Sequence, residues 1–529
     1  MRRAAAGVAA VLALALPAAA HASSTHSANL ARKGITHALK KHWLKASEAR
    51  RYRGTIYRAL RDVRRLPKLR GYVIASQLAQ LTPLWDSYTS PRALALFTQL
   101  DANLDYLETH RVPYTRVDVR DEDGVVYRWF PRLGLEFHPL ANFGALNNVA
   151  AKGDYEATQT LADALVARAI PRGQRLIWEY QFRYGGGRPP WASGMAQAVA
   201  AQALARSSAL LGDPALGVAA VRAYASVPPF LMPLSTGPWI QLYGFSKQVV
   251  LNAQLQSILS LLEYAQTNED ADAASLAQQL ATSAQTMFPR FDTGDWSRYQ
   301  LGGGYATREY QKFVTDLLAK LARQTQDPFW VETSQRFRNY LYDPPQVTQP
   351  APPAEIWPQP ADGYLDTAAI PITLSMRASL SLAIAGKVTS YRLGAGARTL
   401  TWKPPAGLPA GTYTVQVAVR SYAGNKATYT LAPLVVHWET APPPTTATLV
   451  GTTLTWQATD PGTPWLALAI DFVDPAGVNP PQTIDLGQQP LAGSLAVTVP
   501  PGTWQAALRA TNSAGLTTPV DLGTLTSPG

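Results

Sequence analysis

The chain has 529 residues, of which 47% are hydrophobic, and it contains no cysteine. This length exceeds a single hydrophobic core and predicts several domains, while the composition excludes a largely disordered protein. The absence of cysteine excludes disulfides, thiol nucleophiles and cysteine metal sites. The formal net charge of +11 favours an acidic partner, unless it reflects only export, and both nucleic acid and an anionic polysaccharide are acidic.

The first 22 residues have the pattern of a secretory signal peptide. Two arginines precede an apolar run over residues 4–16, and Ala20-His21-Ala22 has the small-residue spacing of a cleavage site before Ser23. The run is too short for a membrane-spanning helix, and no later stretch reaches about 20 unbroken apolar residues. We therefore predict a secreted or extracytoplasmic protein that has no membrane span and does not bind nucleic acid.

Residues 23–112 are predicted to be a basic helical region. Ser90-Pro91 marks a helix start, because serine caps helix N-termini and proline fits the first turn. A cluster of basic residues in this region could bind a polyanion, although we favour a solvated helix face. The cluster consists of Arg61, Arg64, Arg65, Lys68 and Arg70.

Residues 113–345 are predicted to form an α-helical domain with one small β-hairpin. Alternating runs at 114–120 and 125–129 flank a turn that ends in Asp123-Gly124, and Asp-Gly between two such runs indicates a hairpin. Apolar residues then recur at helical spacing, with Gly212-Asp213-Pro214 and Asp327-Pro328 as helix boundaries. Long helices joined by glycine- and proline-rich loops predict an α/α toroid or barrel, a fold that often surrounds a groove suited to a sugar chain.

Residues 346–440 and 441–529 are predicted to be two β-sandwich domains of the immunoglobulin-like or fibronectin-like kind. A proline-rich linker precedes them, and a second proline run at 442–444 divides them. Alternating β-branched and aromatic runs between turn residues indicate strands, and the segments that begin at Pro409 and Pro500 repeat one pattern. A spacer and a carbohydrate-binding module are both compatible with these domains, and we favour the spacer.

Two tyrosines, Tyr299 and Tyr310, lie in a polar, glycine-broken stretch near arginines. Moving a carbon-bound proton from one face of a sugar to the other needs two weak acids on opposite sides of one carbon, and two phenols can supply them. We expect their hydroxyls to face each other across a gap about one pyranose ring wide. A free phenol has a pKa near 10, so nearby cations are needed to ionise it at neutral pH. The candidate cations are Arg298 and Arg308 beside the tyrosines, and Arg183 and Arg188 for a substrate carboxylate.

Five short motifs follow one another along the helical domain. They are residues 134–140, residues 190–197, Trp239 with Tyr243, residues 250–252, and Asp292-Thr293-Gly294 with Tyr299 and Tyr310. In this order they resemble the C-terminal catalytic domain of the D-glucuronyl C5-epimerase family, over roughly residues 125–342. The resemblance implies inversion at C5 of glucuronate units in a polymer such as heparosan, with Tyr299 and Tyr310 as the proton-transfer residues and Tyr243 as a third functional tyrosine.

The same resemblance suggests further substrate-binding residues. His138 lies in the first motif, and Trp191 and Trp239 are candidates for stacking on sugar rings. The chain departs from the family pattern where Gln241 and Leu242 replace acidic residues, and where Gln311 replaces the histidine of the animal members.

The leading hypothesis is therefore a secreted uronate C5-epimerase acting on an anionic uronate-containing polysaccharide. A polysaccharide lyase on the same scaffold would remove the same proton, and a glycoside hydrolase could use Asp292 and Glu136 as its two carboxylates. A non-catalytic glycan-binding envelope protein is the third alternative, for which Leu242 argues. The seven histidines lack metal-site spacing and no nucleotide-binding fingerprint is present, so we infer no required cofactor. The sequence leaves the polymer and the oligomeric state open.

Overall fold

The computed structural model describes residues 16–528, with side chains from residue 23 onward. Residues 1–15 of the predicted signal peptide lie outside the described residues, and helix α1 begins at Leu16. The chain divides into two compact units, one with residues up to 293 and 297–336, the other with residues 294–296 and the chain from 337 onward. No helix in the described part of the chain is long and apolar enough to cross a membrane.

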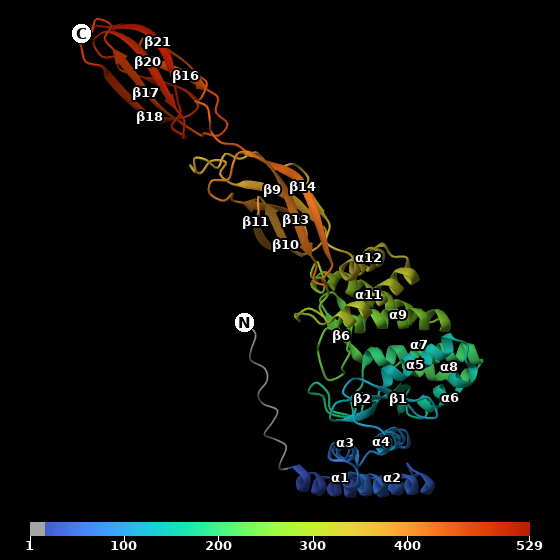
Figure 1. Ribbon diagram of the computed structural model, residues 1–529. Coiled ribbons are helices and arrows are strands. Elements are labelled where there is room, and N and C mark those ends of the chain that lie inside the picture. The colour runs from blue at the N-terminus through green and yellow to red at the C-terminus, as the bar shows by residue number, and fades with distance from the viewer. Residues whose placement is uncertain (1–15, 529) are drawn as a thin grey trace. The chain divides into compact units, whose positions relative to one another are not determined.

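The first unit consists mainly of helices joined by short strands (Figure 1). Its N-terminal helices are α1 (Leu16–Lys40), α2 (Ala46–Arg65), α3 (Lys68–Gln80) and α4 (Ser90–Thr109). The helices that follow are α5 (Pro139–Ala151), α6 (Tyr155–Val166), α7 (Gly194–Leu211), α8 (Pro214–Tyr224), α9 (Leu251–Asn268), α10 (Ala271–Met287) and α11 (Arg308–Thr325). Helix α12 (Pro328–Tyr342) begins in the first unit, and its residues from 337 onward belong to the second.

Local signals in the sequence place several helix ends. Gly212 follows α7 with a φ of 66°, a left-handed conformation that glycine adopts without strain. Asp213 then accepts a hydrogen bond from the Ala215 N–H at the start of α8, so the predicted boundary is confirmed. The predicted start of α4 is wrong by one residue, because the helix includes Ser90 and the capping position is Thr89.

The helices pair into hairpins that stand side by side. Helix α5 packs on α6, α7 on α8 and α9 on α10, while α7 also packs on α5 and α9, and α9 on α11. Because each hairpin reverses the chain, α5, α7, α9 and α11 run in the same direction as one layer. This α/α arrangement confirms the predicted class of the helical domain.

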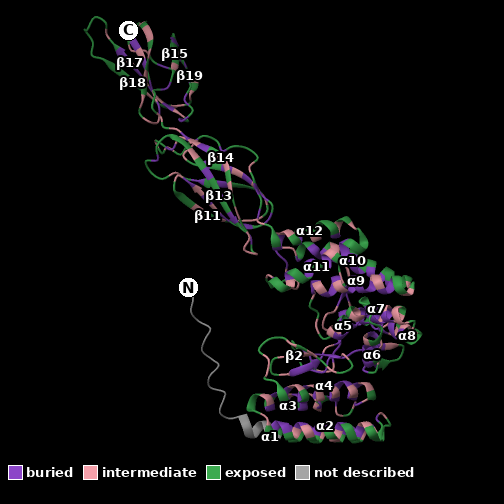
Figure 2. Ribbon diagram, turned by 45° about the vertical axis from the view of Figure 1, so that its right-hand side comes forward, coloured by how far each residue is buried: buried purple, intermediate pink, exposed green. Residues whose placement is uncertain are grey.

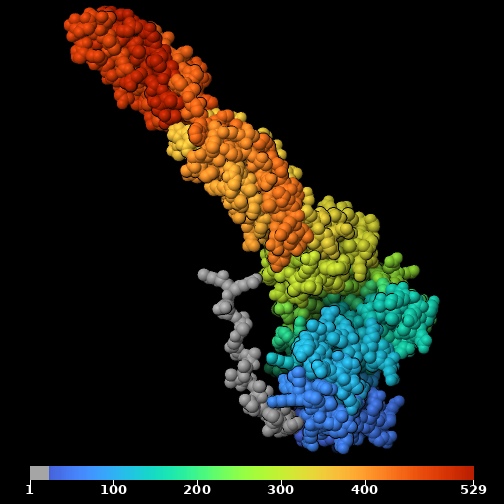
Figure 3. All heavy atoms as spheres, in the orientation of Figure 1, coloured from blue at the N-terminus to red at the C-terminus, as the bar shows by residue number. Residues whose placement is uncertain are grey.

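Apolar side chains hold the first unit together. Figure 2 shows the buried residues of α1 and α2 along one side of each helix, whereas α7 is buried on most sides. One apolar cluster runs from Ile35 in α1 and Phe97 in α4 to Trp178 and to Leu204 in α7. In the space-filling view the atoms of the N-terminal helices and of the elements that follow form a continuous surface (Figure 3).

Three small antiparallel sheets connect the helices. The predicted hairpin is present as β1 (Asp118–Arg120) and β2 (Val126–Phe130), and β3 (Gly134–Phe137), which the sequence did not indicate, extends it. The other two sheets, also unexpected, are β4 (Ile170–Arg172) with β5 (Arg175–Ile177), and β6 (Leu231–Leu234) with β7 (Gly237–Ile240). These strands carry the chain to the starts of α5, α7 and α9.

The second unit holds two β-sandwiches. In the first, β11 (Lys387–Leu393), β10 (Ala378–Ile384), β13 (Gly411–Arg420) and β14 (Lys426–Val436) face β12 (Gly396–Trp402), β9 (Ala368–Leu374) and β8 (Val347–Thr348). In the second, β18 (Gln482–Gln489), β17 (Leu466–Val473), β20 (Gly502–Thr511) and β21 (Thr517–Ser527) face β15 (Thr445–Val450), β16 (Thr453–Ala458) and β19 (Ala492–Ala496).

The sequence repeat has a structural counterpart. The two repeated segments form β13 and β20, and each is the third strand in the order of its four-stranded sheet. Along both strands buried and more exposed residues alternate, as expected for a sheet with one face in a core. The predicted β-sandwich class is therefore confirmed.

Candidate active site

Tyr243 and Tyr299 meet because their loops are fastened to the starts of two neighbouring helices. The N–H of Gly194, the first residue of α7, donates to the carbonyl of Gln241, two residues before Tyr243. The N–H of Leu251, the first residue of α9, donates to the carbonyl of Tyr299. Since α7 packs on α9, the two phenol oxygens come within 3.3 Å and share a hydrogen bond.

Tyr310 lies in the first turn of α11 and holds Tyr299 in place. Its hydroxyl donates to the carbonyl of Tyr299 at 3.1 Å and accepts from the N–H of Asn252 at 3.1 Å. The rings of Tyr299 and Tyr310 meet edge to face, with centroids 5.0 Å apart. Tyr310 therefore ties the start of α11 to Tyr299 and to the start of α9.

The expected gap between the hydroxyls of Tyr299 and Tyr310 is absent. Their rings are in direct contact and the Tyr310 hydroxyl is engaged by the backbone, so no sugar ring fits between them in this structure. Spacing along the chain could not show this, because the ten residues between the two tyrosines include a loop whose path the sequence does not define. The close pair of hydroxyls belongs to Tyr243 and Tyr299.

An aromatic pocket adjoins Tyr243. Its volume is about 180 Å³, and its wall comes from β2, the starts of α5, α7 and α9, and the loop that carries Tyr184. The Tyr184 and Tyr243 rings lie 5.5 Å apart. The lining residues are Arg128, Phe130, His138, Leu140, Tyr180, Phe182, Tyr184, Trp191, Ser193, Leu242, Tyr243 and Asn252. Two of these residues, Arg128 and Tyr184, were not expected from the sequence. The available signals were the alternation in the hairpin for Arg128 and the glycine run after Tyr184.

His138 lines this pocket as a neutral imidazole. Its Nδ1 accepts from the N–H of Ala141 and thereby caps α5, which leaves the proton on Nε2. Burial, and then the nearby Arg128 guanidinium, lower the pKa of His138 to about 3. His138 is thus a hydrogen-bond donor rather than a cation at neutral pH.

The cation in the pocket is Arg128 on β2. Its guanidinium forms two hydrogen bonds with the Asp118 carboxylate, at 2.8 and 2.7 Å, and this pairing lowers the pKa of Asp118. The four arginines expected from the sequence lie elsewhere, and none of them is among the described residues that line the pocket. Arg298 donates to the carbonyl of Gly303, Arg183 and Arg308 are exposed, and Arg188 lines a separate cavity of about 280 Å³.

The two tryptophans differ in position. Trp191 lines the pocket, where its ring stacks on Tyr180 with centroids 4.0 Å apart. Trp239 is fully buried, stacks on Phe291 and donates from its indole N–H to the carbonyl of Val250. Trp239 therefore packs beneath the site and offers no surface to a sugar, which corrects the expectation from the sequence.

Burial controls the protonation of the tyrosines. Desolvation raises the pKa of Tyr243, Tyr299 and Tyr310 above the ordinary value of a phenol, so all three are neutral at pH 7. The expected lowering by neighbouring arginines is not found, because no arginine is among the described groups that shift the pKa of these three tyrosines. Within the pair, the hydrogen bond lowers the pKa of Tyr299 and raises that of Tyr243.

The two carboxylates of the hydrolase alternative are both engaged elsewhere. Glu136 is completely buried and accepts hydrogen bonds from three glutamine side chains. Asp292 pairs with Arg336 at 2.9 Å. Neither residue lines the aromatic pocket, so this pair does not support a glycosidase.

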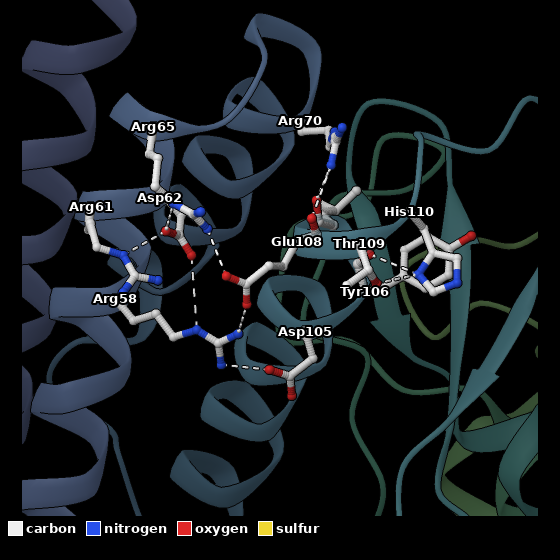
Figure 4. A network of polar contacts seen from close by, with 11 residues as sticks. Arg58, Arg61, Asp62, Arg65, Arg70, Asp105, Tyr106, Glu108, Thr109 and His110 are labelled. Atoms are coloured by element: carbon white, nitrogen blue, oxygen red, sulfur yellow. Dashed lines mark hydrogen bonds and ion pairs between the residues drawn. The ribbon is translucent and has the colours of Figure 1, made fainter.

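Part of the basic cluster of the N-terminal helices pairs with neighbouring groups. Arg61 and Arg65 both contact the buried carboxylate of Asp62, and Arg65 also pairs with Glu108 (Figure 4). Arg70 donates to the backbone carbonyls of Leu107 and Glu108. Arg61 and Arg65 remain half exposed, which is compatible with the solvated helix face that we favoured over a polyanion site.

The part of the chain that contains the three tyrosines is similar to a known protein family. Residues 172–339 match the family model described as the D-glucuronyl C5-epimerase C-terminus. The match covers Tyr243, Tyr299 and Tyr310, confirms the resemblance seen in the sequence and supports a carbohydrate epimerase. Arg128 and His138 lie before the matched segment.

Other comparisons give distant likenesses. A D-mannose isomerase structure is 10% identical, with a TM-score of 0.31, and the alignment covers 38% of this chain and 56% of that chain. An endo-β-1,4-glucanase from Acetobacter xylinum is 15% identical, with a TM-score of 0.28 and coverage of 44% and 77%. Fibronectin(III)-like modules from Clostridium thermocellum are 13% identical, with a TM-score of 0.16 and coverage of 34% and 94%. None of the curated proteins matches the sequence.

Proposed function

We propose that this protein inverts C5 of glucuronate-type units within an anionic polysaccharide, and that it acts outside the cytoplasm after removal of its N-terminal segment. The observation that supports the reaction is the hydrogen-bonded pair Tyr243–Tyr299 beside a pocket that also contains Arg128 and His138. Both tyrosines lie in the segment that matches the epimerase family. The location is inferred from the sequence pattern of residues 1–22.

The hydrogen bond between the two phenols assigns their roles. Burial raises the pKa of both phenols, but their hydrogen bond lowers that of Tyr299 and raises that of Tyr243, so Tyr299 is the phenol that gives its proton to water before the reaction, and Tyr243 donates to the resulting phenolate. The Tyr299 phenolate takes the proton from C5, and the electron pair of the C–H bond moves into the neighbouring carboxylate to give an enediolate. No bond to the rest of the polymer breaks in this step. After turnover Tyr299 returns the proton it has taken from the substrate to water.

Arg128 and His138 stabilise the charge that develops on the carboxyl oxygens. The guanidinium supplies a fixed positive charge, and the neutral imidazole supplies an Nε2–H donor. Both groups are held by other contacts, Arg128 by Asp118 and His138 by the α5 backbone, so they need no reorganisation as the charge forms.

The residue that returns a proton to C5 is Tyr184. Inversion requires a donor on the face of C5 opposite Tyr299, and Tyr243 cannot serve because it is bonded to Tyr299. Tyr184 lines the pocket and is 40% exposed, so its hydroxyl can give a proton to the carbanion and recover one from water. Gly185 and Gly186, with φ of 51° and 89°, follow it in a turn that allows its ring to adjust to a sugar.

Incubation with uronate polymers in heavy water tests this function. The wild-type protein is expected to place deuterium at C5 and leave chain length unchanged, and Tyr299→Phe is expected to reduce uptake at least ~100-fold, as loss of an acid–base group does. Chain shortening with an absorbing double bond would instead identify a lyase. Polymer binding without deuterium uptake by the wild-type protein would identify a glycan-binding protein and overturn the proposal.

A further inference from the structure

A second, larger cavity lies along the layer formed by α5, α7, α9 and α11. Its volume is about 630 Å³. We call it the inner-helix groove, because its lining residues form one stripe on each of the four helices. They recur every three or four positions on α5, α7 and α9, and on α11 they lie at Phe313 and, two turns later, from Lys320 to Gln324. They are Leu140, Gly144, Asn147, Met195, Val199, Gln202, Arg206, Gln256, Leu259, Glu263, Phe313, Lys320, Arg323 and Gln324.

The groove starts at the aromatic pocket. Leu140, near the start of α5, lines both cavities. Met195 at the start of α7 lines the groove and contacts the side chain of Asn252, which lines the pocket. Because the four helices run in the same direction, the groove extends from the tyrosines toward the helix C-termini. From Met195 to Arg206 it follows α7 for ~16 Å, which is longer than one sugar ring.

Polar side chains make up much of the groove wall. Gln202 on α7 accepts hydrogen bonds from Asn147 on α5, at 3.3 Å, and from Ser260 on α9, at 2.9 Å. Gln256 extends this network through Ser260. Amide and hydroxyl groups in such a chain offer both donors and acceptors, which is what the hydroxyls of a sugar ring require.

The charge of the groove is positive. Arg206 pairs with Glu263 and also donates to the carbonyl of Asn147, so one cation is balanced by the carboxylate. Lys320 and Arg323 are exposed on α11 and add two positive charges. On the same helix Phe313 is 41% exposed and gives the groove an aromatic surface on which a sugar ring can stack.

We propose that the inner-helix groove binds the sugar units that flank the reacting uronate, with Lys320 and Arg323 facing their carboxylates and Phe313 contacting a ring. This assignment rests on the proposed function, because it takes the reacting unit to be in the aromatic pocket. It explains how the protein can select a polymer over a single sugar. The occupant is a polyanionic glycan rather than a neutral one, since the exposed charges of the groove are positive.

The test measures binding separately from catalysis. In a Tyr299→Phe background of the full chain, heparosan, hyaluronan and alginate are titrated at low salt, each as a polymer and as a fragment with a single uronate. Lys320→Ala/Arg323→Ala is expected to weaken the tightest polymer about tenfold, as the loss of two exposed charge contacts predicts. The same double substitution is expected to lower the affinity for the single-uronate fragment several-fold less than it lowers the affinity for the polymer.

The matched control is Lys152→Ala/Lys312→Ala, which also removes two positive charges. Lys152 directly follows α5 and Lys312 is on α11, both are exposed, and neither lines the groove. It is expected to retain the affinity of its parent. Equal losses in the two double variants, or no loss in the groove variant, would overturn the groove assignment. Deuterium uptake by the protein without these substitutions is scored in parallel. If deuterium is taken up and the groove variant loses no polymer affinity, only the groove assignment is refuted. If polymer affinity depends on the groove but no deuterium is taken up, only the epimerase proposal is refuted.

Discussion

Glu136 is a carboxyl group enclosed by amides. It lies on β3, and its two oxygens accept hydrogen bonds from Gln77 and Gln80 of α3 and Gln99 of α4, at 2.7–2.8 Å. No positive side chain is among the groups that set its titration, so burial dominates and raises the pKa of Glu136 to about 8. The group joins the N-terminal helices to the strand that leads into α5 and therefore supports the wall of the aromatic pocket.

The stability of the helical unit should depend on pH through this one group. The folded state holds a proton on Glu136 that the unfolded chain releases near its ordinary pKa of 4.5, so the contribution is complete below that pH and is lost as pH rises to about 8. The shift corresponds to roughly 5 kcal/mol of unfolding free energy across this window. Urea unfolding followed by helical circular dichroism measures it. Glu136→Gln should remove most of this slope, whereas Glu332→Gln, at an exposed position of α12, should retain it.

At the same scale, the site shows which residue roles a sequence can predict. Tyr243, Tyr299 and Tyr310 were expected from ordered motifs and do lie together. The expected arginines were neighbours in the chain, and Arg298 instead bonds its own loop. Arg128 reaches the pocket from a strand more than 100 residues before the tyrosines. Adjacency in sequence says little about where a long, flexible side chain points. Arginines chosen because they adjoin the tyrosines therefore did not include Arg128, which is distant in sequence.

At the scale of elements, Gly194 couples the start of α7 to the loop of Tyr243. A methyl group in place of its hydrogen would lie 2.6 Å from Cβ of Phe230, 2.8 Å from Cδ1 of Ile240 and 3.0 Å from the carbonyl oxygen of Gln241. Two of these atoms belong to backbone or to a Cβ, so the strand end must move to relieve the contact. The movement is transmitted to Tyr243, two residues beyond Gln241.

Gly194→Ala is therefore expected to lower both stability and activity. Overpacking of this kind costs ~1–3 kcal/mol, and displacement of Tyr243 from Tyr299 should slow deuterium uptake at least ~10-fold. Gly54→Ala in α2 is the matched control, because no atom lies within 4 Å of the added methyl group. That variant should gain ~0.5–1 kcal/mol of stability without a change in uptake. Equal activity in the two variants would show that the α7 start does not position Tyr243.

Helix ends and strand alternation could be predicted because their signals are local. Gly212-Asp213-Pro214 contains its own stop, cap and start, and the structure uses all three. The inner-helix groove could not be predicted in this way. It depends on which stripe of each helix faces the others, and α5 and α7 are apolar on several sides, so their sequences do not distinguish a groove wall from a core face.

At the scale of the whole molecule, the residues of the candidate active site and the β-sandwiches lie in separate compact units with separate hydrophobic cores. The tyrosine pair, the aromatic pocket and the inner-helix groove are all built from residues of the helical unit. The second sandwich has its own apolar cluster, which includes Trp456, Phe472 and Trp504 and is distinct from the cluster of the first sandwich. We therefore expect that neither folding of the site nor proton transfer requires residues 441–529.

A chain that ends at residue 440 distinguishes the spacer from the carbohydrate-binding module. If the second sandwich is a spacer, deuterium uptake and polymer affinity should stay within about twofold of the full chain, since a domain with its own core can be removed without loss of another. If it binds carbohydrate, affinity for the polymer should fall while uptake at saturating polymer persists, because the catalytic residues remain. Titration of both chains with the same polymer measures the difference. Loss of uptake at saturation, with helical circular dichroism unchanged, would contradict both roles and place part of the active machinery in the removed domain.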